Sequence, residues 1–272
     1  MKKVSKLLIP FLIASSVTIS GCKNKDNKTR ENDDSIDVDL SLKVEDIQEK
    51  DYKMIPQFIA ARLGAYSSYK SVTTGETVST GLINVTQSIN TTCIKSEFSY
   101  TKNESHSSIV NTVHEAYYHD SKAVYRDKDS GDYNVSSLDA YLSTYGSYPF
   151  SYSIEGYSVK EEAIKSVTRE EIENNNIVFK AVFDEEKSTN NVKIQMKKFG
   201  GLDDYPSFSL IEMTFEIDND FTLHKISLHS KYKAKKVLNT NCEQSYNVTF
   251  TNYNDSIEIP NLDSVRNLFN QK

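Results

Sequence analysis

The sequence lacks the short motifs that carry most enzyme chemistry. It has no G-x-S-x-G, H-E-x-x-H, P-loop or G-x-G-x-x-G pattern, which excludes the common hydrolase, zinc-protease and nucleotide-binding signatures. An S-x-x-K pattern at residues 67–70 lacks the S-D-N and K-T-G motifs that accompany it in β-lactamases. The sequence therefore predicts no catalytic residue and no cofactor, and we do not expect an enzyme.

Histidine is also scarce, with 5 residues in the chain, and its spacing does not suit a metal site. His114 and His119 are five residues apart, as are His224 and His229, and an odd separation on a strand sends two side chains to opposite faces. The acidic run at residues 127–132 has glycine where a calcium loop needs its third ligand, so a turn is the better interpretation. No metal site is predicted.

No apolar run is long enough to cross a bilayer as a helix. The run at residues 7–19 has 13 residues, where a helix needs about 20. It follows three lysines and ends in Ser20-Gly21-Cys22, an order of positive, apolar and small residues that is typical of a signal peptide.

These last residues resemble the lipobox of bacterial lipoproteins. The resemblance implies that residues 1–21 are a lipoprotein signal peptide cut just before Cys22. It also implies that Cys22 carries a diacylglyceryl group, which would hold the protein on the extracytoplasmic face of the cell membrane, since two acyl chains anchor stably.

Basic residues are fewer than acidic ones, with 32 Lys and Arg against 38 Asp and Glu. The net charge is −6, and it becomes −9 when residues 1–21 are removed, because they hold three lysines and no acid. Such an acidic body disfavours a nucleic-acid partner. The cations at positions 23, 25, 28 and 30 lie beside the expected anchor, where each could add about 1 kcal/mol of attraction to an anionic leaflet.

Only three cysteines occur, and with Cys22 assigned to the anchor, Cys93 and Cys242 remain. Outside the cytoplasm two such cysteines can pair, and closing so long a loop would add ~5 kcal/mol through the unfolded state. Strand parity is mixed: Cys242 shares its face with apolar Val248, whereas Cys93 shares its face with Lys95 unless a bulge intervenes. We predict a disulfide, with two free thiols as the alternative.

The chain after the anchor divides into a tether and one domain. Residues 23–35 contain no apolar side chain and predict a flexible tether, which we extend over residues 22–50. Residues 36–44 alternate apolar and polar, so they are either a strand or more tether. Residues 51–272 are interpreted as a single globular domain.

Within that domain, helical spacing or capping patterns predict helices at residues 56–68, 138–145, 158–167 and 262–269. In most of the remainder, including residues 192–197, apolar and polar residues alternate with the period of two that is typical of strands. Within residues 82–102 the apolar residues switch from odd to even positions, which indicates a bend or bulge in a long strand. One apolar and one polar face per strand, without helices between successive late strands, predict antiparallel pairing. The predicted class is α+β, mainly β: a large bent antiparallel sheet, an unclosed half-barrel, with an N-terminal helix and two or three helices covering its concave face.

Apolar side chains of one parity should converge on that concave face. An aromatic group in the helical middle of the chain, residues 133–157, is interpreted either as packing or as a lid over an apolar cavity. The residues predicted to face a ligand are Phe179, Phe183, Ile211, Met213, Phe215, Ile226, Leu228, Tyr141 and Tyr145.

The order of these segments, together with residues 252–254 and the Ile-Glu-Ile-Pro sequence at 257–260, is similar to LolA/LppX-type lipoprotein and lipid carriers. The resemblance covers roughly Pro56 to Pro260 and implies an unclosed barrel with helices over an apolar concave face. Two functions stay open: a membrane-anchored protein that binds a lipid or other hydrophobic ligand, and a surface lipoprotein with a filled core that acts through its polar outer face. A monomer is expected, and no protein partner is identified.

Overall fold

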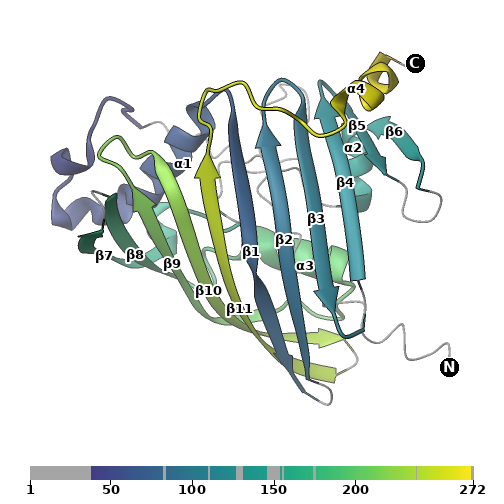
Figure 1. Cartoon of the computed structure of the whole chain (residues 1–272). Helices are drawn as coiled ribbons and strands as arrows, with labels where there is room; N and C mark the ends of the chain where they lie inside the picture. Colours follow the sequence, from purple (N-terminus) through teal and green to yellow (C-terminus); the bar gives the residue numbers. More distant parts are fainter. Residues whose placement is uncertain are drawn as a thin grey trace.

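The computed structural model describes residues 38–81, 84–109, 111–126, 131–145, 154, 156–173, 176–236 and 238–270. The expected signal peptide and Cys22 lie outside the described residues. The strands form one antiparallel sheet in the order β6-β5-β4-β3-β2-β1-β11-β10-β9-β8-β7 (Figure 1). The predicted fold class is confirmed: a mainly β protein with a large bent sheet whose two end strands, β6 and β7, do not pair with each other.

The sheet consists of two meanders. The first contains β1 (Tyr69–Thr80), β2 (Val85–Lys95), β3 (Ser99–Ser107), β4 (Asn111–His119), β5 (Lys122–Arg126) and β6 (Tyr133–Ser137). The second contains β7 (Ile164–Glu173), β8 (Asn176–Phe183), β9 (Ser207–Ile217), β10 (Leu223–Lys236) and β11 (Leu238–Thr251). Within each meander successive strands pair, mostly through short hairpin connections, whereas β8 and β9 pair although residues 184–206 connect them.

The two meanders join where β1 pairs with β11 along its length. Gly75 lies at the middle of this junction, opposite Tyr246. A Cβ at position 75 would lie 2.2 Å from the Ser245 carbonyl oxygen and 2.5 Å from Cδ1 of Tyr246. Glycine therefore permits a close approach of the two strands that no other residue allows.

Three helices cover the concave face, which is the far side of the sheet in Figure 1. They are α1 (Ile55–Ala65), α2 (Leu138–Tyr145) and α3 (Asn190–Gly200). Apolar residues of α1 and α3 belong to one core with β8–β11, and Tyr141 of α2 packs on β4 and β5. The convex face carries α4 (Leu262–Val265) and the 3-10 helix η6 (Arg266–Asn270), which pack on β2–β5 around Tyr117.

The segment before α1 corrects two predictions. Residues 38–43 form no strand, and the chain continues as the 3-10 helices η3 (Val44–Asp46) and η4 (Glu49–Met54). Val44 is buried, and its N–H donates to the Asn219 carbonyl oxygen at 2.9 Å. Arg62 also donates to the Leu40 carbonyl oxygen at 2.9 Å, so residues 38–50 are docked on the domain instead of forming a free tether.

Three further element predictions are corrected. Residues 192–197 are part of helix α3, because Val192 and Met196 are also one helical turn apart and Gly201, at φ 59°, ends the helix. The predicted helix at 158–167 is one 3-10 turn, η5 (Glu161–Ala163), followed by β7. The parity change in 82–102 is a hairpin turn at 96–98 between β2 and β3, not a bulge.

Cys93 and Cys242 are both buried and are not joined by a disulfide, so the predicted disulfide is wrong. Cys93 lies opposite Ser71 of β1, whereas Cys242 lies opposite Ser79 on the other side of the same strand. Eight residues of strand separate these positions by about 26 Å, and a disulfide requires Cα atoms within about 7 Å. No bulge is needed to bury Cys93, because its whole parity on β2 faces the concave side.

Candidate functional site

The concave face is the candidate site, and its two halves differ in chemistry. In the half formed by β8–β10, seven residues predicted to face a ligand lie in one hydrophobic core. Each is between 0% and 4% exposed: Phe179, Phe183, Ile211, Met213, Phe215, Ile226 and Leu228. We call this set the apolar half.

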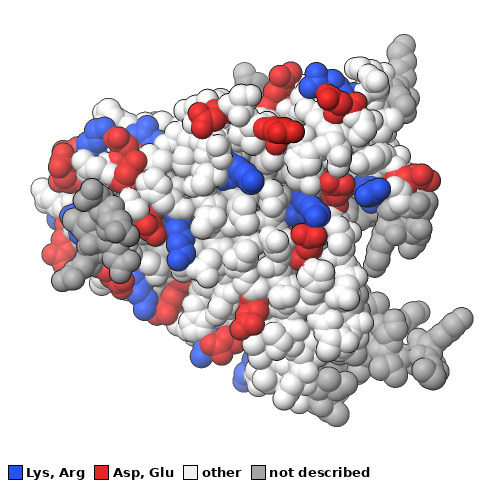
Figure 2. Space-filling model, viewed as in Figure 1, with Lys and Arg blue, Asp and Glu red and all other residues white. Residues whose placement is uncertain are grey.

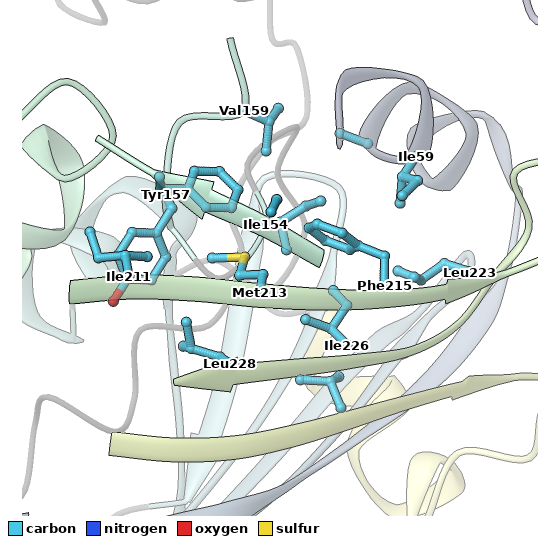
Figure 3. Packing of buried hydrophobic residues seen from close by; sticks show 14 of the residues in the cluster. Ile59, Ile154, Tyr157, Val159, Ile211, Met213, Phe215, Leu223, Ile226 and Leu228 are labelled. Atoms are coloured by element: carbon cyan, nitrogen blue, oxygen red, sulfur yellow. The ribbon is translucent and has the colours of Figure 1, made fainter. Parts of the chain in front are cut away.

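The chain itself covers the apolar half. Figure 3 shows Phe215 and Met213 directed from β9 toward the region of Ile154 and Ile59, and both of these partners are buried in the same core. The ring of Tyr52 in η4 lies edge-on to Phe179, with ring centroids 5.1 Å apart. The side chains of the apolar half are thus packed against residues from α1, η4 and the 154–159 region, as in a solid core.

The half formed by β1–β3 is lined by small and polar side chains. Among them are eight buried residues that point to the concave side, with exposures of 1–6%. They are Ser71, Thr73, Thr77, Ser79, Gln87, Thr91, Thr101 and Ser105. We call these eight residues the polar strip. All eight are neutral, and they lie among Ile89 of the core and the buried Cys93.

Most side chains of the polar strip find partners near them. Thr77 Oγ1 and the Tyr246 hydroxyl are 2.7 Å apart, and Gln87 Nε2 donates to Ser105 Oγ. At its ends the strip contacts the thiols, with Thr101 Oγ1 3.8 Å from Cys93 Sγ. Burying these groups destabilises the fold little, because a buried hydroxyl that forms a hydrogen bond costs little free energy.

Thr91 is an exception within the described part of the chain. Its hydroxyl is buried, the residue is 1% exposed, and Oγ1 has no hydrogen-bond partner among the described residues. The register places it between Thr73 of β1 and Asn103 of β3, on the face that Ile89 shares. A buried hydroxyl without a partner destabilises a fold by about 1–3 kcal/mol, so such groups are rare and often belong to sites.

Beyond the polar strip, α2 closes the concave face with an aromatic cluster. Its rings are those of His114, Tyr118, Tyr125, Tyr141 and Tyr145, with centroids 4.9–5.9 Å apart in most pairs. Tyr141 is buried, whereas Tyr145 is 38% exposed. The two predicted ligand-facing tyrosines therefore lie on α2, in a different cluster from the apolar half.

Hydrogen bonds link three members of this aromatic cluster. The Tyr118 hydroxyl donates to the Tyr141 hydroxyl at 3.2 Å, and the Tyr141 hydroxyl lies 2.6 Å from His114 Nε2. Burial lowers the pKa of His114, against a smaller opposing effect from the Glu115 carboxylate.

The other members of the aromatic group in residues 133–157 do not form one lid. Tyr133 packs on the convex-side cluster with Tyr117, and Tyr157 belongs to the main core. The remaining aromatic positions, 148, 150 and 152, lie outside the described residues. The acidic turn at 127–130 also lies outside them.

A surface pocket of about 470 Å³ lies away from the concave face, at the edge strand β7. It is lined by Lys53, Glu161, Glu162, Ile164, Lys165, Asp184 and Lys187. Cations and carboxylates are mixed here, and Lys165 pairs with Glu185. The Asp184 carboxylate accepts the N–H groups of residues 186 and 187, which lowers its pKa and gives it a structural role in the turn.

The convex face is polar, with acidic and basic residues interspersed (Figure 2). Glu243 accepts from His229 Nε2 at 2.7 Å and lies 3.2 Å from Lys231 Nζ, contacts that lower the pKa of Glu243. Lys235 pairs with Asp204 at 3.1 Å. Two lysines of β10, Lys231 and Lys235, are therefore engaged in exposed ion pairs, which contribute little to stability.

The part of the chain that the structure covers contains no group of three or more His, Cys, Asp or Glu residues arranged for a metal ion. Among the same residues, no helix is both long and apolar enough to span a membrane.

Sequence reasoning did not identify the polar strip. In β1, Ser and Thr occupy both faces, so the strand shows no contrast between an inner and an outer side. Its burial becomes visible only through the pairing register, which aligns Thr73 with Val248 of the core and with Thr91. The alternation of aromatic and apolar residues indicated which face of their strands is buried, whereas the serines and threonines of β1 gave no such indication.

No protein-family model matches this chain, and no curated protein matches it significantly. Among solved structures, it is similar to one described as an outer membrane lipoprotein-sorting protein domain from Vibrio parahaemolyticus, at 12% identity and a TM-score of 0.27, covering 80% of this chain and 98% of that one. It is also similar to a DUF1329 family protein from Desulfovibrio piger, at 8% identity and a TM-score of 0.28, covering 79% of this chain and 97% of the other. At TM-scores this low, the superpositions carry no functional argument.

Proposed function

We propose that this protein is an extracytoplasmic lipoprotein, held at the membrane by a lipid on Cys22, whose half-barrel binds a lipid or other hydrophobic ligand on its concave face. The lipobox-like sequence supports the anchor. The contrast between the two halves of the concave face supports the ligand. In this proposal the ligand lies beside β1–β3, not against the apolar half.

The observation that carries the proposal is the buried polar strip with the unpartnered Thr91 hydroxyl. A face that serves only as a core uses large apolar residues, as most concave positions of β8–β10 do, with Ser230 as an exception. Ligand sites add a few polar groups to such an apolar surface. Because the polar strip is only 1–6% exposed, a ligand would enter beside β1–β3 only where the covering segments move away from the sheet.

Anchoring is tested by detergent-phase partitioning of the full chain. The parent protein should enter the detergent phase, and the Cys22→Ala variant should remain in the aqueous phase because it has no acyl chains. Equal partitioning of the two proteins would remove the anchor from the proposal.

Ligand binding is tested on the full-length Cys22→Ala protein, purified without detergent. Native mass spectrometry should show the protein with added mass that is released as lipid on denaturation. A bare protein that also fails to take up lipid from vesicles would contradict the ligand proposal.

A second function is favoured by a different observation. The seven residues of the apolar half are fully packed, as expected for a surface lipoprotein with a filled core that acts through its polar outer face. In that case the purified protein carries no lipid, and substitutions on the concave face change stability alone. The mass spectrometry above therefore separates the two functions.

A further inference from the structure

The two ends of the sheet differ in what they expose. One end holds the connections of three hairpins, β1–β2, β3–β4 and β10–β11, because Thr80 pairs with Asn241 and Gln87 pairs with Ser107. Figure 1 shows the ends of these strands toward the bottom of the view. In the sequence, a pair of adjacent apolar residues lies at each connection, at 82–83, 109–110 and 237–238.

Large apolar side chains are exposed at this end. Ile109, in the β3–β4 connection, is 41% exposed, and Leu238, the first residue of β11, is 43% exposed. Tyr205 is 57% exposed and lies between β9 and the N–H of Asp203, which donates to the Lys235 carbonyl oxygen at 2.9 Å. We call Ile109, Tyr205 and Leu238 the hairpin end. Neighbouring hairpins of a sheet are about 10 Å apart, so these residues project separately and form no continuous patch.

Lysines lie beside the hairpin end. Lys233 and Lys235 are exposed on β10, within five residues of Leu238. Lys197 Nζ lies 4.4 Å from the centre of the Tyr205 ring. The carboxylate of Asp204 pairs with Lys235 at 3.1 Å, which leaves Lys233 and Lys197 to attract anions.

The turns at the opposite end of the sheet carry acids in place of apolar residues. They contain Glu97, Asp120, Asp218 and Asp220. The side chains of Asp120 and Asp220 are 83% and 52% exposed. A carboxylate is costly to move out of water, whereas an exposed isoleucine or leucine gains free energy when it enters an apolar medium. Only the hairpin end therefore suits contact with hydrocarbon.

We propose that the hairpin end contacts the surface of a lipid bilayer, with Ile109 and Leu238 inserted at the boundary of headgroups and acyl chains and the neighbouring lysines facing anionic phosphates. This inference rests on the proposed anchor at Cys22, which keeps the protein at the membrane. Apolar side chains backed by lysines are the arrangement by which peripheral proteins bind an interface. A fluid bilayer accommodates separate projections, whereas a protein interface buries a continuous complementary patch.

The anchor leaves this contact within reach. Val38 follows Cys22 by sixteen residues, and a chain of that length spans at most about 53–58 Å. The next residues lie at the acidic end of the sheet, where Lys43 pairs with Asp220. The 14 residues of β10 extend over about 46–48 Å from that end to the hairpin end. The sixteen residues are thus long enough for the hairpin end to touch the anchoring bilayer.

The test uses the absence of tryptophan from the chain, which makes a single tryptophan report on its own position. Ile109→Trp and Leu238→Trp place the probe at the hairpin end. The matched control is Leu40→Trp, because Leu40 is 36% exposed and bonds to Arg62 at the acidic end. Each full-length protein is reconstituted through its lipid anchor into vesicles of phosphatidylcholine and phosphatidylglycerol, with and without brominated acyl chains.

The emission of Ile109→Trp and Leu238→Trp should shift to shorter wavelength and lose intensity in the brominated vesicles, which quench tryptophan on contact. Leu40→Trp should keep the emission of a tryptophan in water in both kinds of vesicle.

A charge test uses the Leu238→Trp protein. Adding Lys233→Gln should lower the ratio of docked to undocked protein up to about 5-fold, since one lysine near an anionic surface contributes about that factor. Adding Lys225→Gln instead, on the same face at the other end of β10, should leave the quenching unchanged.

Water-like, unquenched emission from both hairpin-end tryptophans in the anchored protein would overturn this inference and leave the anchor intact. Short-wavelength emission without quenching would also overturn it, because protein, such as a second copy of the chain, would then cover these side chains. Quenching of Leu40→Trp alone would show that the acidic end faces the bilayer. A protein that does not sediment with the vesicles would overturn the proposed anchor and this inference together.

Discussion

Phe215 gives the sharpest test of whether the apolar half is solid. The residue is 0% exposed, lies opposite Phe179 of β8 and Ile226 of β10, and is directed toward the buried Ile154 (Figure 3). In a packed core, Phe→Ala removes the transfer energy of the ring and leaves a cavity, at a cost of about 3–5 kcal/mol. At about 2–4 °C per kcal/mol for a domain of this size, the melting temperature should fall by about 6–20 °C.

Urea unfolding followed by circular dichroism measures the change in the free energy of unfolding. The control is Tyr205→Ala, which truncates an aromatic residue that is 57% exposed, and it should cost less than about 1 kcal/mol. If Phe215→Ala cost no more than the control, the ring would face empty space. The ligand would then belong in the apolar half, as the sequence first indicated.

Three further predictions follow from the described contacts. Because the fold lowers the pKa of His114, stability should be constant above about pH 6.5 and fall as the pH drops below it, and His114→Phe should flatten this slope in thermal melts. Gly75→Ala should destabilise the protein by about 1–3 kcal/mol in urea titrations, since its Cβ would overlap β11; a neutral result would show that β1 and β11 can separate freely. Cys93 and Cys242 should both react with a thiol reagent after denaturation of a sample kept oxidised, whereas a disulfide-linked peptide pair would refute the register.

The sequence predicts the class of this fold because its apolar strands alternate clearly. In β9, large apolar residues occupy alternate positions at 211, 213, 215 and 217, and all four are buried on the concave side. The same rule failed for residues 192–197, because Val192 and Met196 satisfy both a strand and a helical turn. The glycines at 200 and 201 were the signal for a helix end.

The structure of the segment before α1 and the distance between the two cysteines depend on long-range packing, which the local sequence pattern does not reveal. The alternation around Val44 suits a strand or a tether equally. In the structure Val44 is buried in the main core, and its N–H bonds to the carbonyl oxygen of Asn219, which lies far away in the sequence. The cysteines looked like a pair because the compartment permits one, but only the register shows that they lie on opposite sides and at opposite ends of β1.

The candidate site was predicted only in its apolar part. Phe179, Met213 and Phe215 converge as their parity indicated, yet they meet residues from α1 and η4 instead of open space. The polar strip depends on which face of a uniformly hydroxyl-rich strand is covered, and composition does not encode that choice.

The most direct test of ligand binding beside β1–β3 is photolabelling of the full-length Cys22→Ala protein with a monoacylglycerol that carries a diazirine near its ester group. Peptide mapping should place the adducts on β1–β3 and the helices facing them, and an excess of unlabelled monoacylglycerol should suppress them. Adducts confined to β8–β10, or labelling that excess ligand does not suppress, would contradict the account.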